Sequence, residues 1–365
     1  MTAPHGGPLA GIRIVEFDAI GPVPLAGMIL SDLGAEIIRI GRPGSAARVN
    51  SSGNAILMRG RKTTELDLKD KAQRDQAMEL IAGADAMLEG QRPGVMERLG
   101  LGPEDCLAHN PKLVYGRMTG WGQDGPLSQT AGHDIDYIAI TGALGSMGRK
   151  DAPPPPPLNL VGDYGGGTMF LIMGVLAAIL SAKQTGKGQV VDAAMTDGAS
   201  ILMSMFYAFH GIGMWQAERE ANLLDGGTPF YRCYETSDGL YMAVGCLEPQ
   251  FFAAFLDKLD LDPEEFPQQD RGIWPKMVET FETKFASRTR DEWAAHFDGS
   301  DACVAPVLSI AEAPEHPHNA ARQTFGEHGG VTHPMPAPRF SETPSAIGED
   351  SGAIGIDDAI ARWSP

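Results

Sequence analysis

The chain has 365 residues, 43% of them hydrophobic, so it is long enough to bury a sizeable core in one large domain or two. Its 47 acidic residues outnumber its 29 basic ones, which gives a formal charge of -18. Most of the surface of such a protein should repel nucleic acid and anionic membranes. A polyanionic ligand therefore requires a local basic pocket.

The four cysteines, Cys106, Cys233, Cys246 and Cys303, are scattered along the chain and form no CxxC pair. This spacing indicates neither a zinc knuckle nor a disulfide framework and favours a reducing compartment. The first residues lack the basic and apolar regions of a signal peptide, and the last three residues are not a peroxisomal signal. We expect a cytoplasmic protein.

Predicted strands and helices alternate in the first part of the chain. Two β-α-β units are predicted, each built from an apolar strand, a helix followed by a glycine, and a second strand. The first has strands at 12–17 and 36–40 around a helix that ends before Gly34, and the second has strands at 63–68 and 86–89 around a helix at 69–82. This alternation predicts an α/β fold, with a Rossmann-like parallel sheet covered by helices on both faces.

Two stretches without Asp, Glu, Lys or Arg, at 164–182 and 198–217, are long enough to suggest membrane spans. The first opens with three glycines and the second contains His210, so we predict buried core helices instead of membrane insertion. The first is predicted to be a long helix ending near Lys183, and the second a helix that continues through Met214.

The composition predicts two domains joined by a helix. A large Rossmann-like domain at 1–200 is completed by a proline-rich C-terminal arm at 330–365, and a linking helix is expected at 201–225. The segment 226–329 begins with a sequence typical of β-strands and continues with charged sequences typical of helices. This order predicts a smaller α+β domain.

A stiff loop containing five consecutive prolines leads to Asp163 in the segment VGDYGGG. At the start of a predicted helix, Asp163 can serve simply as the helix cap. The same position also suits catalysis, because glycine amides at a helix N-terminus form a donor cluster for an oxyanion beside a carboxylate. Both interpretations stay open on position alone.

Other candidate residues each have a simple structural interpretation. His133 lies in the motif GHD before an apolar stretch, and Glu248 follows a strand-like run, so both can be ordinary structural residues. The segment GDYGGG does not match GxGxxG and GxxxxGK[ST] is absent, which weakens dehydrogenase and NTPase interpretations. No metal site is predicted, because the histidines near the C-terminus lack an HExxH pattern and cysteine partners; they are His316, His318, His328 and His333.

Basic residues are concentrated early in this acidic chain. We expect most of them on solvated faces. Several nevertheless follow predicted strands, where open parallel sheets bind ligands, and arginine is well suited to phosphate recognition. The set comprises Arg39, Arg42, Arg59, Arg61, Lys62, Lys69, Arg92 and Arg98.

In combination, the segments RPGVMERLG, GQDGP, AGHDIDYIA, LNLVGDYGGGTMF and GKGQVVDAAMTDG resemble the α-methylacyl-CoA racemase branch of the family III CoA-transferase superfamily. The resemblance spans nearly the whole chain, including the arm segment PAPRFSETP. It implies an enzyme that interconverts (2R)- and (2S)-2-methylacyl-CoA thioesters by 1,1-proton transfer through an enolate. It also implies a role in lipid metabolism, no metal or redox cofactor, CoA as part of the substrate, and an interlocked homodimer.

The resemblance assigns roles to particular residues. His133 and Asp163 are expected to flank the substrate α-carbon, and Glu248 is expected to support His133. The residues expected to bind CoA are Arg42, Leu66, Asp67, Leu68, Lys69, Gly90, Gln91, Arg92, Arg98, Gly132, Asp134, Ile135, Asp136 and Tyr137.

Two other functions compete with racemisation. In a CoA-transferase of the same superfamily, Asp163 would attack a CoA thioester to form an acyl anhydride. A non-catalytic acyl-CoA carrier would need no paired acid and base. Four methionines are either plain core or a soft surface for an acyl chain: Met195, Met203, Met205 and Met214.

Overall fold

The computed structural model describes residues 6–45, 56–348 and 351–364. The chain forms two compact units. The large unit comprises Met1–Ala143, Pro156–Ser204 and Gln323–Pro365, and the small unit comprises Leu144–Pro155 and Met205–Arg322. The structure therefore differs from the predicted boundaries: Leu144–Pro155 belongs to the small unit, that unit resumes at Met205, and the arm begins at Gln323.

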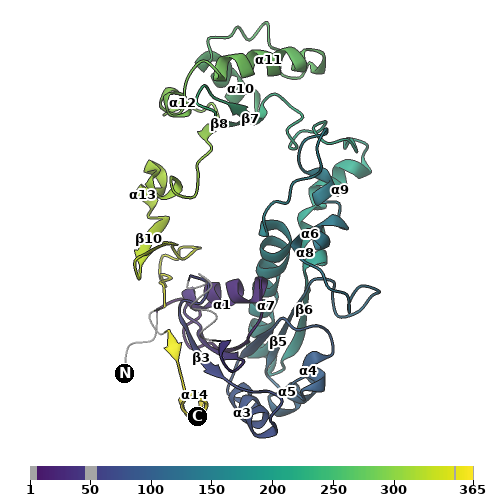
Figure 1. Cartoon of the computed structure of the whole chain (residues 1–365), viewed down its shortest axis with the longest axis vertical. Helices are drawn as coiled ribbons and strands as arrows, with labels where there is room; N and C mark the ends of the chain where they lie inside the picture. The colour runs from purple at the N-terminus through teal and green to yellow at the C-terminus, as the bar shows by residue number, and fades with distance from the viewer. Residues whose placement is uncertain (1–5, 46–55, 349–350, 365) are drawn as a thin grey trace. The chain divides into compact units, whose positions relative to one another are not determined.

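A seven-stranded sheet in which all neighbouring strands are parallel forms the centre of the large unit (Figure 1). The strand order is β12-β3-β2-β1-β4-β5-β6, so it reverses between β1 and β4, as in a Rossmann fold. The predicted fold class is confirmed. The strands are β1 (Arg13–Phe17), β2 (Glu36–Gly41), β3 (Arg61–Glu65), β4 (Ala86–Glu89), β5 (Val114–Thr119), β6 (Gln189–Ala194) and β12 (Gly352–Ala353).

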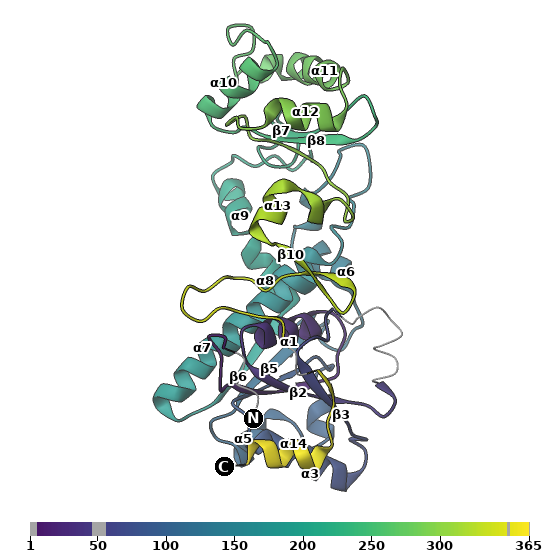
Figure 2. The same ribbon diagram turned by 90° about the vertical axis from the view of Figure 1, so that its left-hand side faces the viewer.

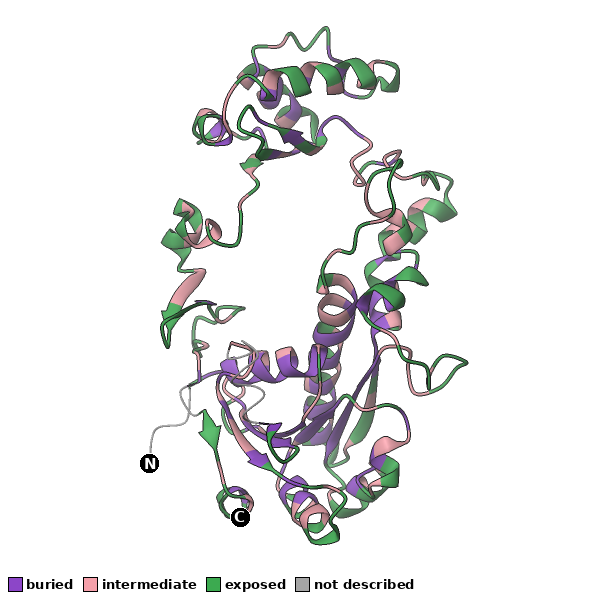
Figure 3. Ribbon diagram, in the orientation of Figure 1, coloured by how far each residue is buried: buried purple, intermediate pink, exposed green. Residues whose placement is uncertain are grey.

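The central strands are buried on both faces (Figure 3) because their side chains form nearly continuous apolar runs. Val15 of β1 lies opposite Ile38 of β2 and Met87 of β4. The strand predicted at 63–68 is displaced, since β3 begins at Arg61 and ends at Glu65. Residues 66–69 consequently form the loop after β3, at the carboxyl edge of the sheet.

Helices cover both faces of the sheet. One face packs against α1 (Pro22–Asp32) and α7 (Met169–Thr185), and the other against α3 (Lys71–Ala82), α5 (Pro103–His109) and α14 (Ile356–Trp363). The Asp70 carboxylate caps α3 by accepting the N–H of Gln73 at 3.0 Å, and α1 begins with a proline, which suits the first turn of a helix.

The C-terminal arm extends the large unit. A hairpin of β10 (Phe325–His328) and β11 (Val331–Pro334) leads to β12, which pairs with the edge strand β3, and to α14, which packs on α3 (Figure 2). Trp363 and Ala359 of α14 enter the core. The arm is therefore structural, because it completes the sheet and buries a tryptophan.

The predicted apolar helices have different boundaries in the structure. The first begins as a π-helix, Leu160–Thr168, and continues as α7. The second is interrupted at Met203 between α8 (Met195–Leu202) and α9 (Ser204–Gly211). The segment 201–225 is thus not one linking helix, and the helix expected through Met214 ends at Gly211.

The helical stretch Leu160–Thr185 is long and apolar enough to cross a membrane, by length and composition only, and its most apolar 18 residues have a mean hydropathy of 1.9. Half of these 18 residues are buried within the protein. Leu171, Val175 and Ile179 of this stretch belong to the core that covers the sheet. A core helix passes the same test, so the length and composition of this stretch are weak evidence for a membrane span.

The small unit contains an antiparallel sheet of β7 (Tyr231–Glu235), β8 (Tyr241–Gly245) and β9 (Val304–Pro306). Its helices are α10 (Pro249–Lys258), α11 (Trp274–Phe285), α12 (Arg290–Phe297) and α13 (Pro317–Arg322). Aromatic side chains dominate its core. The ring centroids of Phe255 and Phe281 lie 5.0 Å apart in an edge-to-face arrangement, which is favourable for aromatic pairs.

A buried ionic cluster attaches the arm to the sheet unit. The Arg59 guanidinium donates to both carboxylate oxygens of Asp32, at 3.0 and 2.5 Å, and to the carbonyl of Pro334 at 2.9 Å. Its Nη1 atom also lies 3.1 Å from His333 Nδ1, and His333 is only 3% exposed. Burial and the Arg59 charge lower the pKa of His333 below 6.5.

We expect His333 to contribute a fall in the free energy of unfolding as the pH is lowered below about 6.5. This contribution is opposite in sign to that of buried Glu89, whose pKa is raised to about 7. The lowered pKa of His333 means that the unfolded chain binds this proton more readily than the folded chain, so protonation favours unfolding. Urea denaturation at several pH values between 5.5 and 7.5 measures this dependence. His333→Asn should reduce the slope, whereas His109→Asn, at an exposed site, should keep it. Equal slopes in wild type and His333→Asn would contradict the prediction.

Candidate active site

The candidate site lies at the carboxyl edge of the sheet, where the strand order reverses between β1 and β4. Asp18 follows β1, and Gly90 and Gln91 follow β4. The Gln91 N–H donates to Glu89 Oε2 at 2.6 Å, and its Nε2 donates to the carbonyl of Asp18 at 3.0 Å. The loops after the two strands are thus joined at the crevice where Rossmann-like folds bind ligands.

A cavity of about 500 Å³, here called the loop cavity, opens beside this crevice. Its apolar wall includes Phe17 and Ile40, and its rim carries three cations, Arg42, Lys69 and Arg98. The cations concentrate positive charge in an otherwise acidic protein, as a phosphate-bearing ligand requires. Seven residues expected to bind CoA line this cavity: Arg42, Leu66, Asp67, Leu68, Lys69, Gln91 and Arg98.

A second cavity of about 690 Å³, here called the aspartate cavity, shares Asp18, Arg42 and Gln91 with the loop cavity. It is also lined by Gly90, which was expected to bind CoA, and by Asp163. The two cavities are therefore adjacent, and Asp163 lies on the wall of the second.

The Asp163 carboxyl group is half-buried and tightly surrounded. Asn159 Nδ2 donates to its Oδ2 atom at 3.3 Å, and its main-chain N–H donates to Asp134 Oδ1 at 2.6 Å. A Cβ added at Gly21 would lie only 3.0 Å from Asp163 Oδ2. Burial raises the pKa of Asp163, and the Asp134 charge raises it further, against the lowering effects of Asn159 and His133. Asp163 is thus suited to hold a proton.

The structure corrects both sequence-based interpretations of the VGDYGGG segment. Asn159, not Asp163, occupies the cap position, and Asp163 lies inside the π-helix. The Tyr164 N–H donates to the carbonyl of Asn159, five residues earlier, at 3.2 Å. In a π-helix the following amides continue this pattern, so Gly165, Gly166 and Gly167 do not form a free donor cluster.

The glycines instead allow α8 to pack closely against the π-helix. A Cβ at Gly166 would lie 2.7 Å from the main-chain nitrogen of Ala199, and a Cβ at Gly198 would lie 1.9 Å from the carbonyl oxygen of Gly166. Neither position has room for a side chain. Close helix packing therefore explains these two glycines without a catalytic role.

His133 precedes the short helix α6 (Asp134–Ala139) and is exposed. Its main-chain N–H donates to the Asp136 carboxylate at 2.9 Å. The Tyr137 hydroxyl donates to the carbonyl of Gly132, and its ring packs edge-on against Trp121 with centroids 4.8 Å apart. The structure thus holds the GHD loop in place and brings His133 within electrostatic range of Asp163, although 30 residues of sequence separate them.

Several predicted site residues are placed elsewhere. Glu248 is exposed at the start of α10 in the small unit, and its support of His133 stays a prediction. Met195 and Met203 are buried in the large unit, whereas Met205 and Met214 are exposed in the small unit. Six residues expected to bind CoA are not among those lining the two cavities: Arg92, Gly132, Asp134, Ile135, Asp136 and Tyr137.

Most of the eight early basic residues are exposed or half-buried, as expected, but three are buried: Arg39, Arg59 and Arg61. Arg61 Nη1 lies 2.7 and 2.6 Å from the two carboxylate oxygens of fully buried Glu16. Arg39 pairs with Asp18 on the wall of the aspartate cavity. Buried guanidinium groups require such ionic partners, which sequence position alone does not reveal.

Sequence reasoning missed three residues that line the aspartate cavity: Asp18, Gly21 and Asn159. Asn159 lies in the segment LNLVGDYGGGTMF, which carries the family resemblance, and Asp18 and Gly21 lie in the loop after β1. Among the residues that the structure describes, no group of three or more His, Cys, Asp or Glu side chains could hold a metal ion.

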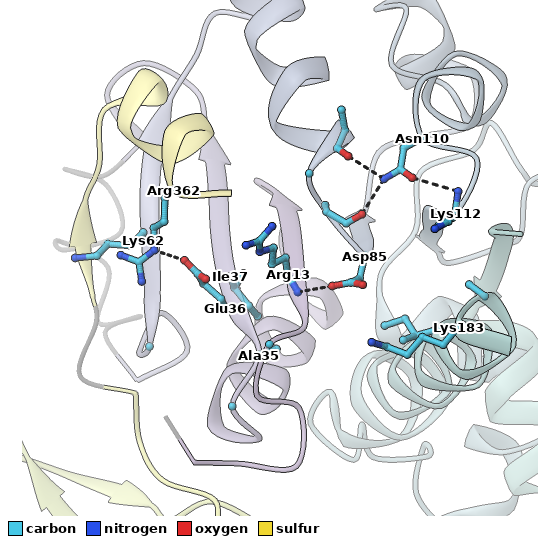
Figure 4. A pocket seen from close by; sticks show the side chains of 18 of the residues that line it. Arg13, Ala35, Glu36, Ile37, Lys62, Asp85, Asn110, Lys112, Lys183 and Arg362 are labelled. Carbon is cyan, nitrogen blue, oxygen red and sulfur yellow. Dashed lines mark hydrogen bonds and ion pairs between the residues drawn. The ribbon is translucent and has the colours of Figure 1, made fainter. Parts of the chain in front are cut away.

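Another cavity, of about 710 Å³, lies at the opposite, amino-terminal edge of the sheet. Figure 4 shows Arg13, Lys112, Lys183 and Arg362 entering it from different elements. Part of this charge is neutralised locally, because Arg362 pairs with Glu36, and the Arg13 guanidinium donates to the carbonyl of Trp363 at 2.8 Å. None of the predicted site residues lines it, so we place the candidate active site at the carboxyl edge.

Comparison with known proteins shows the family of the chain. A family model described as CoA-transferase family III matches residues 9–357. The chain belongs to this family. It is 44% identical to the α-methylacyl-CoA racemase of Mus musculus over 92% of this chain and 87% of the relative, and 42% identical to that of Homo sapiens over the same shares.

Solved structures of the family share the fold. The hypothetical protein Rv3272 from Mycobacterium tuberculosis superimposes with a TM-score of 0.82 at 26% identity, covering 99% of this chain and 100% of that one. A CaiB/BaiF family protein from Brucella suis, at 22% identity and a TM-score of 0.80, supports the fold alone.

Proposed function

We propose that this chain is a racemase that interconverts the two epimers of 2-methylacyl-CoA thioesters. The observation that carries the proposal is the half-buried Asp163, which lies within electrostatic range of His133 and beside a cavity lined by three cations. A racemase needs two proton-transfer groups for one carbon, together with a place for an anionic CoA moiety. The racemase names of relatives that are 42–44% identical support the same function.

The proposed mechanism is a proton transfer across the α-carbon. A thioester α-proton is weakly acidic, so the developing enolate must be stabilised as the proton leaves. His133 removes the proton from one epimer while protonated Asp163 delivers a proton to the other face, and the roles reverse for the opposite epimer. The raised pKa of Asp163 favours the protonated form that this step needs. Donors to the enolate oxygen must come from groups other than the amides of the three glycines.

The loop cavity is proposed to bind the phosphates of CoA through Arg42, Lys69 and Arg98. Arg98→Gln should raise the KM for the CoA thioester about tenfold and leave kcat nearly unchanged, because a phosphate contact away from the reacting carbon contributes mainly ground-state binding. Steady-state kinetics at several salt concentrations measure both parameters. Lys71→Gln, at a well-exposed ion pair on α3 outside both cavities, is the control. A loss confined to kcat would contradict the assignment.

We further propose an interlocked homodimer. Several large apolar side chains on α7 and α8 are exposed in the single chain: Met173, Leu180, Ile201 and Leu202. Obligate dimer interfaces bury such surfaces. Sedimentation equilibrium tests the proposal, and a monomer at micromolar concentration would reject it. The high negative charge argues against nucleic acid and membranes as partners, and the scattered cysteines support a cytoplasmic location. A role in lipid metabolism without a metal or redox cofactor follows from the proposed racemase reaction.

A CoA-transferase is the second candidate, because family relatives include a succinyl-CoA:glutarate CoA-transferase of Mus musculus, 28% identical over 92% of this chain. In that reaction Asp163 would be the nucleophile. Incubation with an acyl-CoA and hydroxylamine would then yield a hydroxamate at Asp163. Absence of the adduct would count against transfer.

Proton NMR of a single 2-methylacyl-CoA epimer in D₂O tests the proposed function directly. Racemisation predicts α-deuteration together with approach to an equal mixture of epimers. No exchange with several such thioesters, together with CoA transfer to an added carboxylate, would favour the transferase. Absence of both reactions would favour a passive carrier.

A further inference from the structure

Asp134 lies between the two candidate catalytic groups and has a side chain that is almost entirely buried. It follows His133 directly in the sequence and is 7% exposed. Its Oδ1 atom accepts the main-chain N–H of Asp163 at 2.6 Å. Its Oδ2 atom is buried without a hydrogen-bond partner among the residues that the structure describes. Burying a carboxylate oxygen without a partner is costly, which calls for an explanation.

The Asp134 carboxylate packs closely against the π-helix at Gly162. A Cβ at Gly162 would lie 2.5 Å from Asp134 Oδ1 and 3.2 Å from its carbonyl oxygen. Only a glycine at position 162 permits the first turn of the π-helix to approach α6 so closely. The residue before Asp163 and the residue after His133 are therefore in direct contact.

We propose that Asp134 is a positioning residue that holds the Asp163 carboxyl and the His133 imidazole in a fixed relation across the substrate carbon. The inference rests on the proposed racemase function of that pair. It differs from the expectation that Asp134 contacts CoA, since its side chain faces the π-helix. The Asp134 side chain accepts a hydrogen bond from the main chain of Asp163, and the Asp134 main chain is joined to His133 by a peptide bond. These two bonds link the Asp163 segment to the His133 segment.

The charge of Asp134 has a second effect. The ionisable groups around Asp163 are His133, Asp134 and Tyr137 of the α6 segment, and Asp18, Arg39, Arg42 and Tyr164 on the cavity wall. Arg39 is paired with Asp18, and this ion pair offsets much of the positive charge of Arg39. The Asp134 carboxylate raises the pKa of Asp163 and His133 lowers it. Removing the Asp134 charge should consequently lower the pKa of Asp163.

Asp134→Asn separates the two effects, because the amide oxygen can still accept the Asp163 N–H but carries no charge. The limb of the pH profile of kcat/KM that reports Asp163 should move to lower pH for both epimers, with KM little changed. Asp134→Ala removes the hydrogen bond as well and should lower kcat about tenfold or more through misplacement of Asp163. Asp197→Asn, an exposed carboxylate on α8, which packs on the π-helix, is the matched control and should match wild type.

A titration that needs no turnover keeps this inference separate from the proposed function. Infrared spectroscopy follows the protonated carboxyl band of Asp163, identified by its loss in Asp163→Asn. The band should disappear at lower pH in Asp134→Asn than in wild type. An unchanged band titration, or wild-type kinetics in Asp134→Ala, would overturn the inference. A shifted titration in a protein that does not racemise its substrates would reject the proposed function and retain the coupling of Asp134 to Asp163.

Discussion

His133→Ala is expected to lower racemisation of both epimers by about 10²- to 10⁴-fold, the usual contribution of a positioned acid–base group. One epimer needs this imidazole as the base, and the other needs the imidazolium as the acid, so neither direction survives its loss. Binding of the CoA thioester should persist, because the cations of the loop cavity are untouched. Deuteration in D₂O, followed by NMR, measures turnover, and isothermal titration calorimetry measures binding.

The matched control for this variant is His109→Ala, which removes an exposed histidine from α5 of the same unit. It should retain both binding and turnover. Loss of thioester binding in His133→Ala, with normal turnover at saturating substrate, would place His133 in substrate binding and contradict the proposed role.

Asp163→Asn is expected to lower racemisation in both directions by a similar factor, since an amide neither accepts nor delivers the required proton. The two epimers should nevertheless differ in D₂O. The epimer whose α-proton faces His133 can still lose it to the imidazole and regain a deuteron on the same face, so it should exchange slowly with retention. The opposite epimer should not exchange. NMR of each epimer separately distinguishes these outcomes.

Asp197→Asn is again the matched carboxylate control and should racemise both epimers at the wild-type rate. Rapid exchange of both epimers in Asp163→Asn would show that His133 acts on both faces and would reject the two-sided mechanism. Loss of hydroxamate formation, rather than of proton exchange, would identify Asp163 as the nucleophile of a transferase.

The strands were predictable wherever the hydrophobic pattern was local and continuous. The strand predicted at 86–89 coincides with β4, and the strands predicted at 12–17 and 36–40 differ from β1 and β2 by one residue each. The strand predicted at 63–68 was displaced because β3 begins with Arg61 and Lys62, which hydrophobicity does not favour. Burial of Arg61 depends on Glu16, 45 residues earlier, and no local pattern encodes that ion pair.

The helical predictions failed where hydrogen bonding, not hydrophobicity, decides the structure. Apolar periodicity predicts that residues around Asp163 are helical, but it does not distinguish a π-helix from an α-helix, since the two differ in which carbonyl accepts each N–H. That difference removed the glycine amides from the expected oxyanion site. The interruption at Met203 between α8 and α9 likewise has no signal in a uniformly apolar stretch.

The sequence by itself determined the parallel α/β architecture, the family resemblance and the identity of His133 and Asp163 as candidates, because these depend on periodicity and on short motifs within one segment. Only the tertiary structure places His133 within electrostatic range of Asp163, bonds the Asp163 N–H to Asp134, and gathers Arg42, Lys69 and Arg98 at one cavity. Those relations depend on contacts between segments far apart in the chain. Electrostatic interactions between these residues depend on burial and on the distance between charges, and the local residue pattern does not encode either quantity.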